Sequence, residues 1–167
     1  PNVAIKGKLV IMASGKKEVF EKFKPLFESI AEQSVYLGET GTAHSIKLAM
    51  NLQIAMLALS LSEGITLTKK AGFDPEIFLK ILNSTYFKTG MSEGKAYKMI
   101  SDSVKPTFTL ANLKKDLDTI NDAAESFDAE LPMAKIARKI YADATEAGFG
   151  DIDYTGIISY IRKLSRD

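Results

Sequence analysis

The hydrophobic pattern changes character near residue 38. Before it, short apolar runs at 8–12 and 34–37 predict two strands. Between them, apolar residues recur at three- and four-residue steps from Lys16 to about Ala31, which predicts an amphipathic helix that Pro25 could kink. Strand, helix, strand is the βαβ unit of a parallel sheet. One such unit is too small to bury both faces of its sheet, so we expect it to be the tail of a larger domain.

From residue 39 onward the pattern is helical throughout. A segment rich in Ala, Leu, Met and Lys predicts one long helix over 42–70, with Gly72 as its C-cap, and Asp74-Pro75 predicts the start of the next helix. Further helices are expected around Ser92–Ser101, Thr109–Phe127, Pro132–Ala147 and Tyr154–Ser165. The predicted fold class is therefore mainly α with a long central helix, and the predicted domains are residues 1–38 and an all-helical domain at 39–167.

The overall composition narrows the possible partners. The 167 residues carry a net charge of +1, with Lys and Glu mixed along the chain, so a nucleic acid partner is not expected. No cysteine and a single histidine leave no metal site to expect, and a chain without cysteine fits a cytoplasmic protein. The apolar run Leu48–Leu61 is interrupted by polar residues and is shorter than the roughly 20 residues of a membrane span. We expect a buried helix there and no membrane, and we interpret the start at Pro1 as a cut or processed end.

One short segment carries candidate chemistry. Lys47 and Asn51 are four residues apart, so on a helix they project from one face and can meet the same small molecule. Ile46, Leu48, Ala49 and Met50 around them are apolar, and Met50 is expected to lie in the core. A lysine amine in such surroundings has to be paired or to lower its pKa, and a lowered pKa suits proton exchange near neutrality. On spacing alone, a structural interpretation is favoured, in which Lys47 reaches water and Asn51 is a satisfied core amide.

Several motifs follow one another along the chain. They are Gly7–Gly15 (GKLVIMASG), Phe23-Lys-Pro-Leu26, Tyr36-Leu-Gly38, Gly41 with Lys47 and Asn51, Phe108 with Lys115-Asp116-Leu117, and Gly150-Asp-Ile-Asp153. In this order and spacing they resemble the β-hydroxyacid dehydrogenase family of the 6-phosphogluconate dehydrogenase superfamily, whose members include 3-hydroxyisobutyrate dehydrogenases and glyoxylate/succinic semialdehyde reductases. The resemblance covers essentially all of the chain.

The resemblance implies a fold, an activity and a set of site residues. It implies a helical 6-phosphogluconate dehydrogenase-like C-terminal domain after a remnant of a Rossmann domain, and reversible hydride transfer between NAD or NADP and a small hydroxyacid or its aldehyde. Lys47 would be the catalytic general acid/base and Asn51 would bind the substrate. Phe108, Lys115 and Asp116 would bind the cofactor. The family's Gly-x-Gly-x-x-Gly turn and substrate loop do not occur in this sequence, so the fragment alone is expected to be inactive.

Other interpretations stay open at this point. Without the resemblance, Lys115 and Asp116 are an exposed charge pair and Phe108 is an ordinary core aromatic, while His44 is interpreted as a helix-start residue. Members of this family commonly form dimers or tetramers through their C-terminal helices, so the resemblance implies a homo-oligomer. The competing hypothesis is a non-catalytic helical module for oligomerisation or interaction. A helical regulatory domain unrelated to dehydrogenases is a third, but it does not account for the strand, helix and strand at the start.

Overall fold

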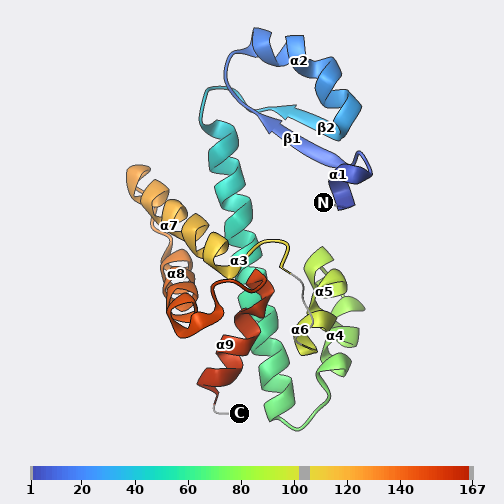
Figure 1. Cartoon of the computed structure of the whole chain (residues 1–167), viewed down its shortest axis with the longest axis vertical. Helices are drawn as coiled ribbons and strands as arrows, with labels where there is room; N and C mark the ends of the chain where they lie inside the picture. Colours follow the sequence, from blue (N-terminus) through green and yellow to red (C-terminus); the bar gives the residue numbers. More distant parts are fainter. Residues whose placement is uncertain (1, 102–105, 166–167) are drawn as a thin grey trace. The chain divides into compact units, whose positions relative to one another are not determined.

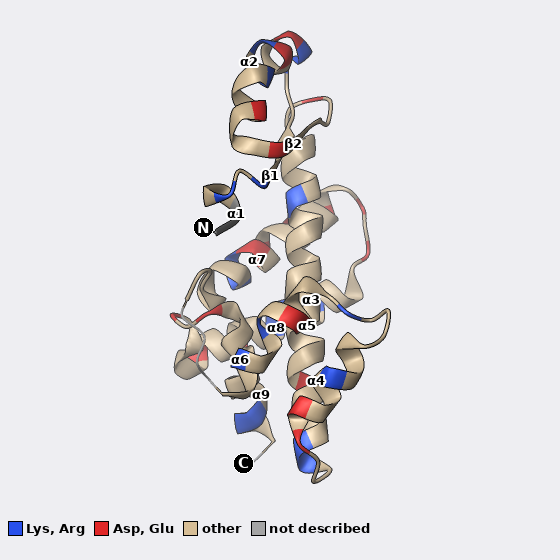
Figure 2. Ribbon diagram, turned by 90° about the vertical axis from the view of Figure 1, so that its right-hand side faces the viewer, with Lys and Arg blue, Asp and Glu red and all other residues tan. Residues whose placement is uncertain are grey.

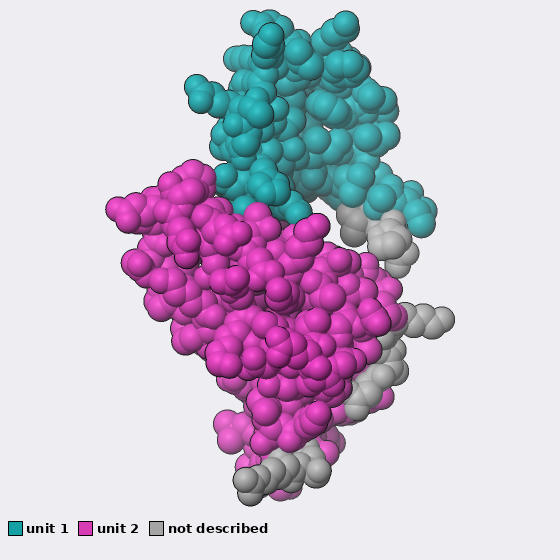
Figure 3. Space-filling model, turned by 60° about the vertical axis from the view of Figure 1, so that its left-hand side comes forward, with its two compact units in different colours: residues 1–49 teal, residues 50–167 magenta. Residues whose placement is uncertain are grey.

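The chain forms two compact units, residues 1–49 and 50–167 (Figure 3). The computed structural model describes residues 2–101 and 106–165. Helix α3 (Thr42–Lys70) contains the boundary between the two units. The division of compact units therefore falls eleven residues after residue 38, where the hydrophobic pattern changes, because one uninterrupted helix carries the chain from the first unit into the second.

The first unit is the predicted βαβ arrangement (Figure 1). Its elements before α3 are α1 (Asn2–Ile5), β1 (Leu9–Ala13), α2 (Lys17–Ile30) and β2 (Ala31–Tyr36). The two strands pair in parallel, with Ile11 opposite Ser34, and α2 packs against them. Helix α2 runs through Pro25 as one element. The parallel pairing confirms the prediction from the alternation of strand, helix and strand.

Few side chains are buried in the first unit. The ring of Phe20 lies 5.3 Å from the ring of Tyr36, whose hydroxyl donates a hydrogen bond of 2.7 Å to the carbonyl of Gly15. Large apolar side chains nevertheless stay exposed on both the strand and the helix: Val10, Val19, Phe23, Leu26 and Ile30. Two strands and one helix thus do not cover their own apolar residues, as expected for so small a sheet.

The second unit is helical throughout its described residues. After the larger part of α3 it contains α4 (Pro75–Asn83), α5 (Gly90–Gly94), α6 (Ala96–Ile100), α7 (Leu110–Ser126), α8 (Pro132–Ala144), the π-helical turn η1 (Thr145–Phe149), the 3-10 turn η2 (Tyr154–Gly156) and α9 (Ile157–Leu164). The predicted caps are confirmed. Gly72 has a φ of +84° after α3, and the carboxylate of Asp74 accepts a hydrogen bond of 2.9 Å from the backbone N–H of Glu76.

The helix predicted around 92–101 is wrong in two respects. It begins earlier, because Thr89 and Ser92 form a reciprocal capping box that starts α5 at Gly90. It is also two helices, which meet at Lys95, where φ is −121°. Capping chemistry explains the early start, whereas the break depends on tertiary contacts of Lys95.

The core of the second unit forms where α3 meets α4, α6 and α9. Its central cluster consists of Leu61, Ile65, Leu79, Ala96, Met99 and Ile158. Helices α7 and α8 pack against each other through small buried residues that include Ala124, Ala134 and Ala137. Small side chains let two helix backbones approach closely, so this contact leaves little room for larger residues.

Helix α3 is long and apolar enough, by length and composition alone, to cross a membrane, contrary to the sequence analysis. Its 18-residue window has a mean hydropathy of 1.4, and 39% of that window is buried inside the protein. Leu61 and Ile65 of this helix belong to the core cluster, and the core helix of a globular protein passes the same test. The expectation of a buried helix is met only in part: Leu61 is 4% exposed, but Met50, expected in the core, is 54% exposed.

Gly64 in α3 provides a test of this packing. A Cβ atom at position 64 would lie 2.7 Å from Cζ of Phe78. Replacing glycine by alanine inside a helix normally stabilises it by roughly 0.5–1 kcal/mol. Here we expect Gly64→Ala to lower the free energy of unfolding by about 1–3 kcal/mol, because the ring must move. Urea denaturation measures the change.

Gly94 is the matched control for that substitution. A Cβ atom at position 94 would meet no heavy atom within 4 Å, so Gly94→Ala should be neutral or slightly stabilising. If Gly64→Ala were to stabilise the protein as much as Gly94→Ala, the described contact between α3 and Phe78 would be wrong.

Candidate functional site

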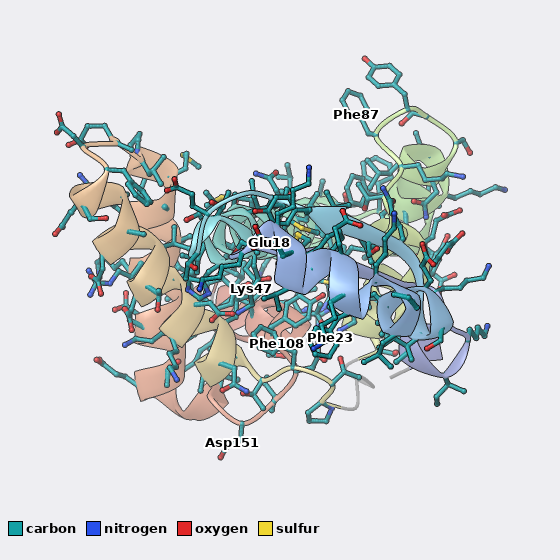
Figure 4. All side chains as sticks on the ribbon, turned by 90° about the horizontal axis from the view of Figure 1, so that it is seen from above. Glu18, Phe23, Lys47, Phe87, Phe108 and Asp151 are labelled. Atoms are coloured by element: carbon teal, nitrogen blue, oxygen red, sulfur yellow. The ribbon has the colours of Figure 1, made fainter. Side chains whose placement is uncertain are left out.

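Lys47 lines an open hollow of about 500 Å³ within the first unit. One wall is the end of β1, Met12 to Ser14, and the other is the start of α3, including His44. Lys47 is exposed in the described structure (labelled in Figure 4), as in the interpretation in which its amine reaches water. The hollow presents the amine where a small molecule could reach it.

Two glycines shape the chain that leads to this hollow. Gly38 and Gly41 have φ values of +87° and +102°, a region that residues with a Cβ adopt rarely. The carbonyl of Gly38 accepts a hydrogen bond of 2.8 Å from the N–H of Gly15, which ties the segment after β2 to the segment after β1. Helix α3 then starts at Thr42, five residues before Lys47.

Asn51 and Asp116 are brought together in the second unit. The side-chain amide of Asn51 donates a hydrogen bond of 2.5 Å to the carboxylate of Asp116, across 65 residues of sequence. Both side chains are half-buried. The sequence analysis assigns Asn51 to the substrate and Asp116 to the cofactor, so this bond joins two residues whose predicted ligands react with each other.

Lys115 and Phe108 lie on the same stretch of chain as Asp116. Lys115 is exposed on α7, one residue before Asp116, while Phe108 is half-buried two residues before α7 begins. The ring of Phe108 packs edge-on against the ring of Tyr154, with 6.0 Å between the ring centres. Phe108 is therefore held by the protein on one side without being enclosed.

The sequence analysis missed a buried polar cluster around Asp153. The carboxylate of Asp153, 1% exposed, accepts hydrogen bonds from the backbone N–H and hydroxyl of Thr107 at 3.1 and 3.0 Å and from the hydroxyl of Thr155 at 2.7 Å. Lys95 Nζ lies 3.1 Å from each carboxylate oxygen. Burial alone raises the pKa of Asp153, but the bonds from Thr107, Thr155 and Lys95 outweigh it and the pKa is lowered. The only sequence signal was the Gly150-Asp-Ile-Asp153 motif, which assigned this residue no partner.

Other charged side chains pair along a helix or between neighbouring helices. Figure 2 marks the charged positions on the ribbon. Asp118 binds Lys114 at 2.7 Å and Arg138 at 2.8 Å, which joins α7 to α8. Burial alone raises the pKa of Asp118, but the hydrogen bonds from Lys114 and Arg138 outweigh this effect, so the pKa is lowered. Among residues 2–101 and 106–165, no group of three or more His, Cys, Asp or Glu side chains could hold a metal ion.

Comparison with known proteins matches two family models to the chain. Residues 41–161 match the family model described as the NAD-binding domain of NADP-dependent 3-hydroxyisobutyrate dehydrogenase, and residues 1–38 match the NAD binding domain of 6-phosphogluconate dehydrogenase. The structure is similar to that of 3-hydroxyisobutyrate dehydrogenase from Salmonella typhimurium, with a TM-score of 0.88 and 22% identity, covering 95% of this chain and 56% of that one. The predicted fold is thereby confirmed.

Two curated relatives show the range of proteins to which this chain is similar in sequence. The chain is 30% identical over 161 residues to glyoxylate/succinic semialdehyde reductase 1 of Arabidopsis thaliana, covering 96% of the chain and 55% of the reductase. It is 27% identical over 161 residues to the cytokine-like nuclear factor N-PAC of Aedes aegypti, covering 96% of the chain and 28% of that protein. The chain thus spans about half the length of the reductase and a smaller share of the nuclear factor.

The bond between Asn51 and Asp116 yields a test that depends on pH. Asn51→Asp would set two carboxylates against each other, which raises the pKa of one of them. A raised carboxyl pKa costs no stability at low pH, where the pair holds a proton, and costs progressively more as pH rises above about 4. We expect the melting temperature of Asn51→Asp to be near that of the wild type at pH 4 and to fall below it by pH 7, by the equivalent of about 1–3 kcal/mol.

Asn51→Ala serves as the control, since it removes the same bond without adding a charge. Its penalty should be nearly constant between pH 4 and pH 8. A pH-independent penalty for Asn51→Asp as well would show that residues 51 and 116 do not face each other.

Proposed function

The chain belongs to the β-hydroxyacid dehydrogenase family, as the C-terminal part of a 3-hydroxyisobutyrate dehydrogenase-like protein, and we propose that the whole protein reduces a small aldehyde to its hydroxyacid, reversibly, with NAD(P)H. The observation that carries the proposal is the placement of Lys47, an exposed amine in the hollow at the end of β1. Members of this family act through a lysine that the Gly41, Lys47 and Asn51 segment matches.

Lys47 is proposed to move the proton. In the reductive direction its ammonium group donates a proton to the carbonyl oxygen while the carbonyl carbon is reduced, and the resulting amine takes the proton back from the hydroxyl group in oxidation. Asn51 is proposed to bind the substrate beside it. The bond from Asn51 to Asp116 supports this role, because an amide whose donor is already held by a carboxylate keeps one orientation.

The residues predicted to meet the cofactor suit a flat ring and a charged phosphate. Phe108 offers a partly exposed aromatic ring and Lys115 an exposed cation. When bound, NAD(P)H supplies the hydride that reduces the carbonyl carbon. Phe108, Lys115 and Asp116 would orient it, with the main cofactor contacts made by other parts of the whole protein, so that the isolated fragment is inactive. A cytoplasmic location is part of the same proposal, supported by the lack of cysteine.

Lys47→Ala in the full-length protein tests the catalytic assignment. A positioned general acid or base contributes about 10²–10⁴-fold to rate, so we expect kcat for aldehyde reduction to fall by about two orders of magnitude or more. Cofactor affinity and the circular dichroism spectrum should stay unchanged. Oxidation of NAD(P)H, followed by absorbance over a panel of small aldehydes and oxo acids, gives the rates.

Lys69→Ala is the matched control for Lys47→Ala, because Lys69 is an exposed lysine in the last turn of the same helix. Its rate should equal that of the wild type. Turnover retained in Lys47→Ala would remove the lysine from the mechanism, and no turnover by the wild type on any panel member would favour the second candidate function.

That second candidate is self-association, and exposed apolar residues of the second unit support it. An open groove of about 320 Å³ lies between α3 and α8, lined by Met56, Ile136 and Ile140 among others. Phe87 projects from the loop after α4 (Figure 4) and stacks on Tyr86, with 4.4 Å between ring centres. Exposed apolar groups of this kind often mark interfaces, so a dimer or tetramer is proposed for the whole protein, with or without catalysis.

Light scattering on the full-length protein tests self-association through the groove. Ile136 is 53% exposed, so Ile136→Glu should fold normally, yet it would place a charge in an apolar interface. We expect the wild type to be a dimer or larger, Ile136→Glu to shift toward monomer at micromolar concentration, and Lys47→Ala to assemble like the wild type. A strictly monomeric wild type would contradict the proposal.

A further inference from the structure

The segment 150–154 clamps the start of α7. The N–H of Leu110 donates to the carbonyl of Ile152 and the N–H of Ala111 donates to the carbonyl of Gly150, both at 2.9 Å. In the opposite direction, the N–H of Tyr154 donates a bond of 3.0 Å to the carbonyl of Phe108. The first N–H groups of a helix have no partner within the helix, so these bonds attach the entry of α7 to one particular segment of chain.

Asp153 adds side-chain bonds to the same clamp. Its carboxylate binds the N–H and the hydroxyl of Thr107, the residue directly before Phe108. Phe108 therefore has its own carbonyl bonded to Tyr154 and the preceding residue bonded to Asp153. Its ring lies against Tyr154, and the amine of Lys95 sits over the same Tyr154 ring, 4.2 Å from its centre.

A buried ion pair often adds little to the free energy of unfolding. Apolar residues of similar volume often stabilise a core as well as a buried ion pair does, because an ion pair has to offset the desolvation of both charges. The carboxylate of Asp153 adds directed bonds: through Thr107 and Lys95 it holds two segments distant in sequence at one point, and it also binds the nearby Thr155. The segment held most directly is the one that presents Phe108.

We propose that Asp153, assisted by Lys95, is a positioning residue for cofactor binding that holds Phe108 where it can contact NAD(P)H. The inference rests on the proposed function, in which Phe108 contacts the cofactor. Asp153 itself is buried and touches neither cofactor nor substrate. Loss of its bonds should therefore weaken cofactor binding by releasing Phe108, and should leave the affinity for the aldehyde nearly unchanged.

The test compares Asp153→Asn with Asp151→Asn in the full-length protein. Asparagine keeps the shape of Asp153 but removes the charge and presents an amide group to the donors around it. We expect the Kd and the KM for NAD(P)H to rise by roughly 10-fold or more, with the KM for the aldehyde changing by less than about 3-fold. Asp151 is exposed two residues earlier in the same segment (Figure 4), so Asp151→Asn should match the wild type.

A double-mutant cycle separates positioning from general destabilisation. If Asp153 acts through Phe108, Asp153→Asn should weaken cofactor binding much less when Phe108→Ala is already present. Equal, additive losses in the two backgrounds would overturn the proposal. Thr107→Val removes the hydroxyl that donates to Asp153 and accepts from Lys95, but keeps the backbone bond to Asp153. It should give a smaller shift in the same direction, and it keeps the test decisive should Asp153→Asn not fold.

The outcomes also distinguish this inference from the proposed function. If Phe108→Ala weakens cofactor binding but neither Asp153→Asn nor Thr107→Val does, the positioning role is wrong and the dehydrogenase proposal stands. If Phe108→Ala alone does not change the affinity for NAD(P)H, Phe108 does not contact the cofactor, and the positioning role fails with that premise.

Discussion

The second unit depends on how α3 buries one stripe of side chains. The buried positions recur at three- and four-residue steps and include Ala55, Ala58, Ser62, Ile65 and Thr66. Because the first of these are small, neighbouring helices can approach the backbone of α3 closely. The buried hydroxyl of Ser62 needs no partner from another helix, because it donates a hydrogen bond of 2.7 Å to the carbonyl of Ala58 in the same helix. Further along α3, residues of α4, α6 and α9 pack with Leu61 and Ile65 in the core cluster.

The site residues depend on two kinds of information. Lys47 and Asn51 lie on one helix, so their spacing of four is meaningful in the sequence itself. The bond between Asn51 and Asp116 and the clamp on Phe108 join segments far apart in sequence, and they exist only because the helices fold onto one another. The lysine proposed to be catalytic is therefore placed by local rules, and the other proposed site residues by tertiary packing.

The same distinction explains which predictions succeeded. Long periodic segments such as α3 and α7 were predicted with nearly the observed bounds, because their periodicity and caps are local signals. The break at Lys95 could not be predicted, since it accompanies an ion pair with Asp153, 58 residues away. The exposure of Met50 was missed for a similar reason, because composition does not tell which side of an apolar helix lacks a neighbour. Family resemblance identified Asp153 as part of a motif but could not supply its partners.

The start of α7 has a consequence for electrostatics. The positive end of a helix commonly holds a phosphate through its free N–H groups. In α7 those groups are already committed: Leu110 and Ala111 donate to backbone carbonyls, and Asn112 donates to the hydroxyl of Thr109 at 3.2 Å. The N–H groups of these three residues are therefore not available to an anion. A phosphate near this helix end would have to be attracted by side chains such as Lys115, which is exposed. A long, flexible side chain selects less strictly between anions of different shape than a rigid set of backbone N–H donors does.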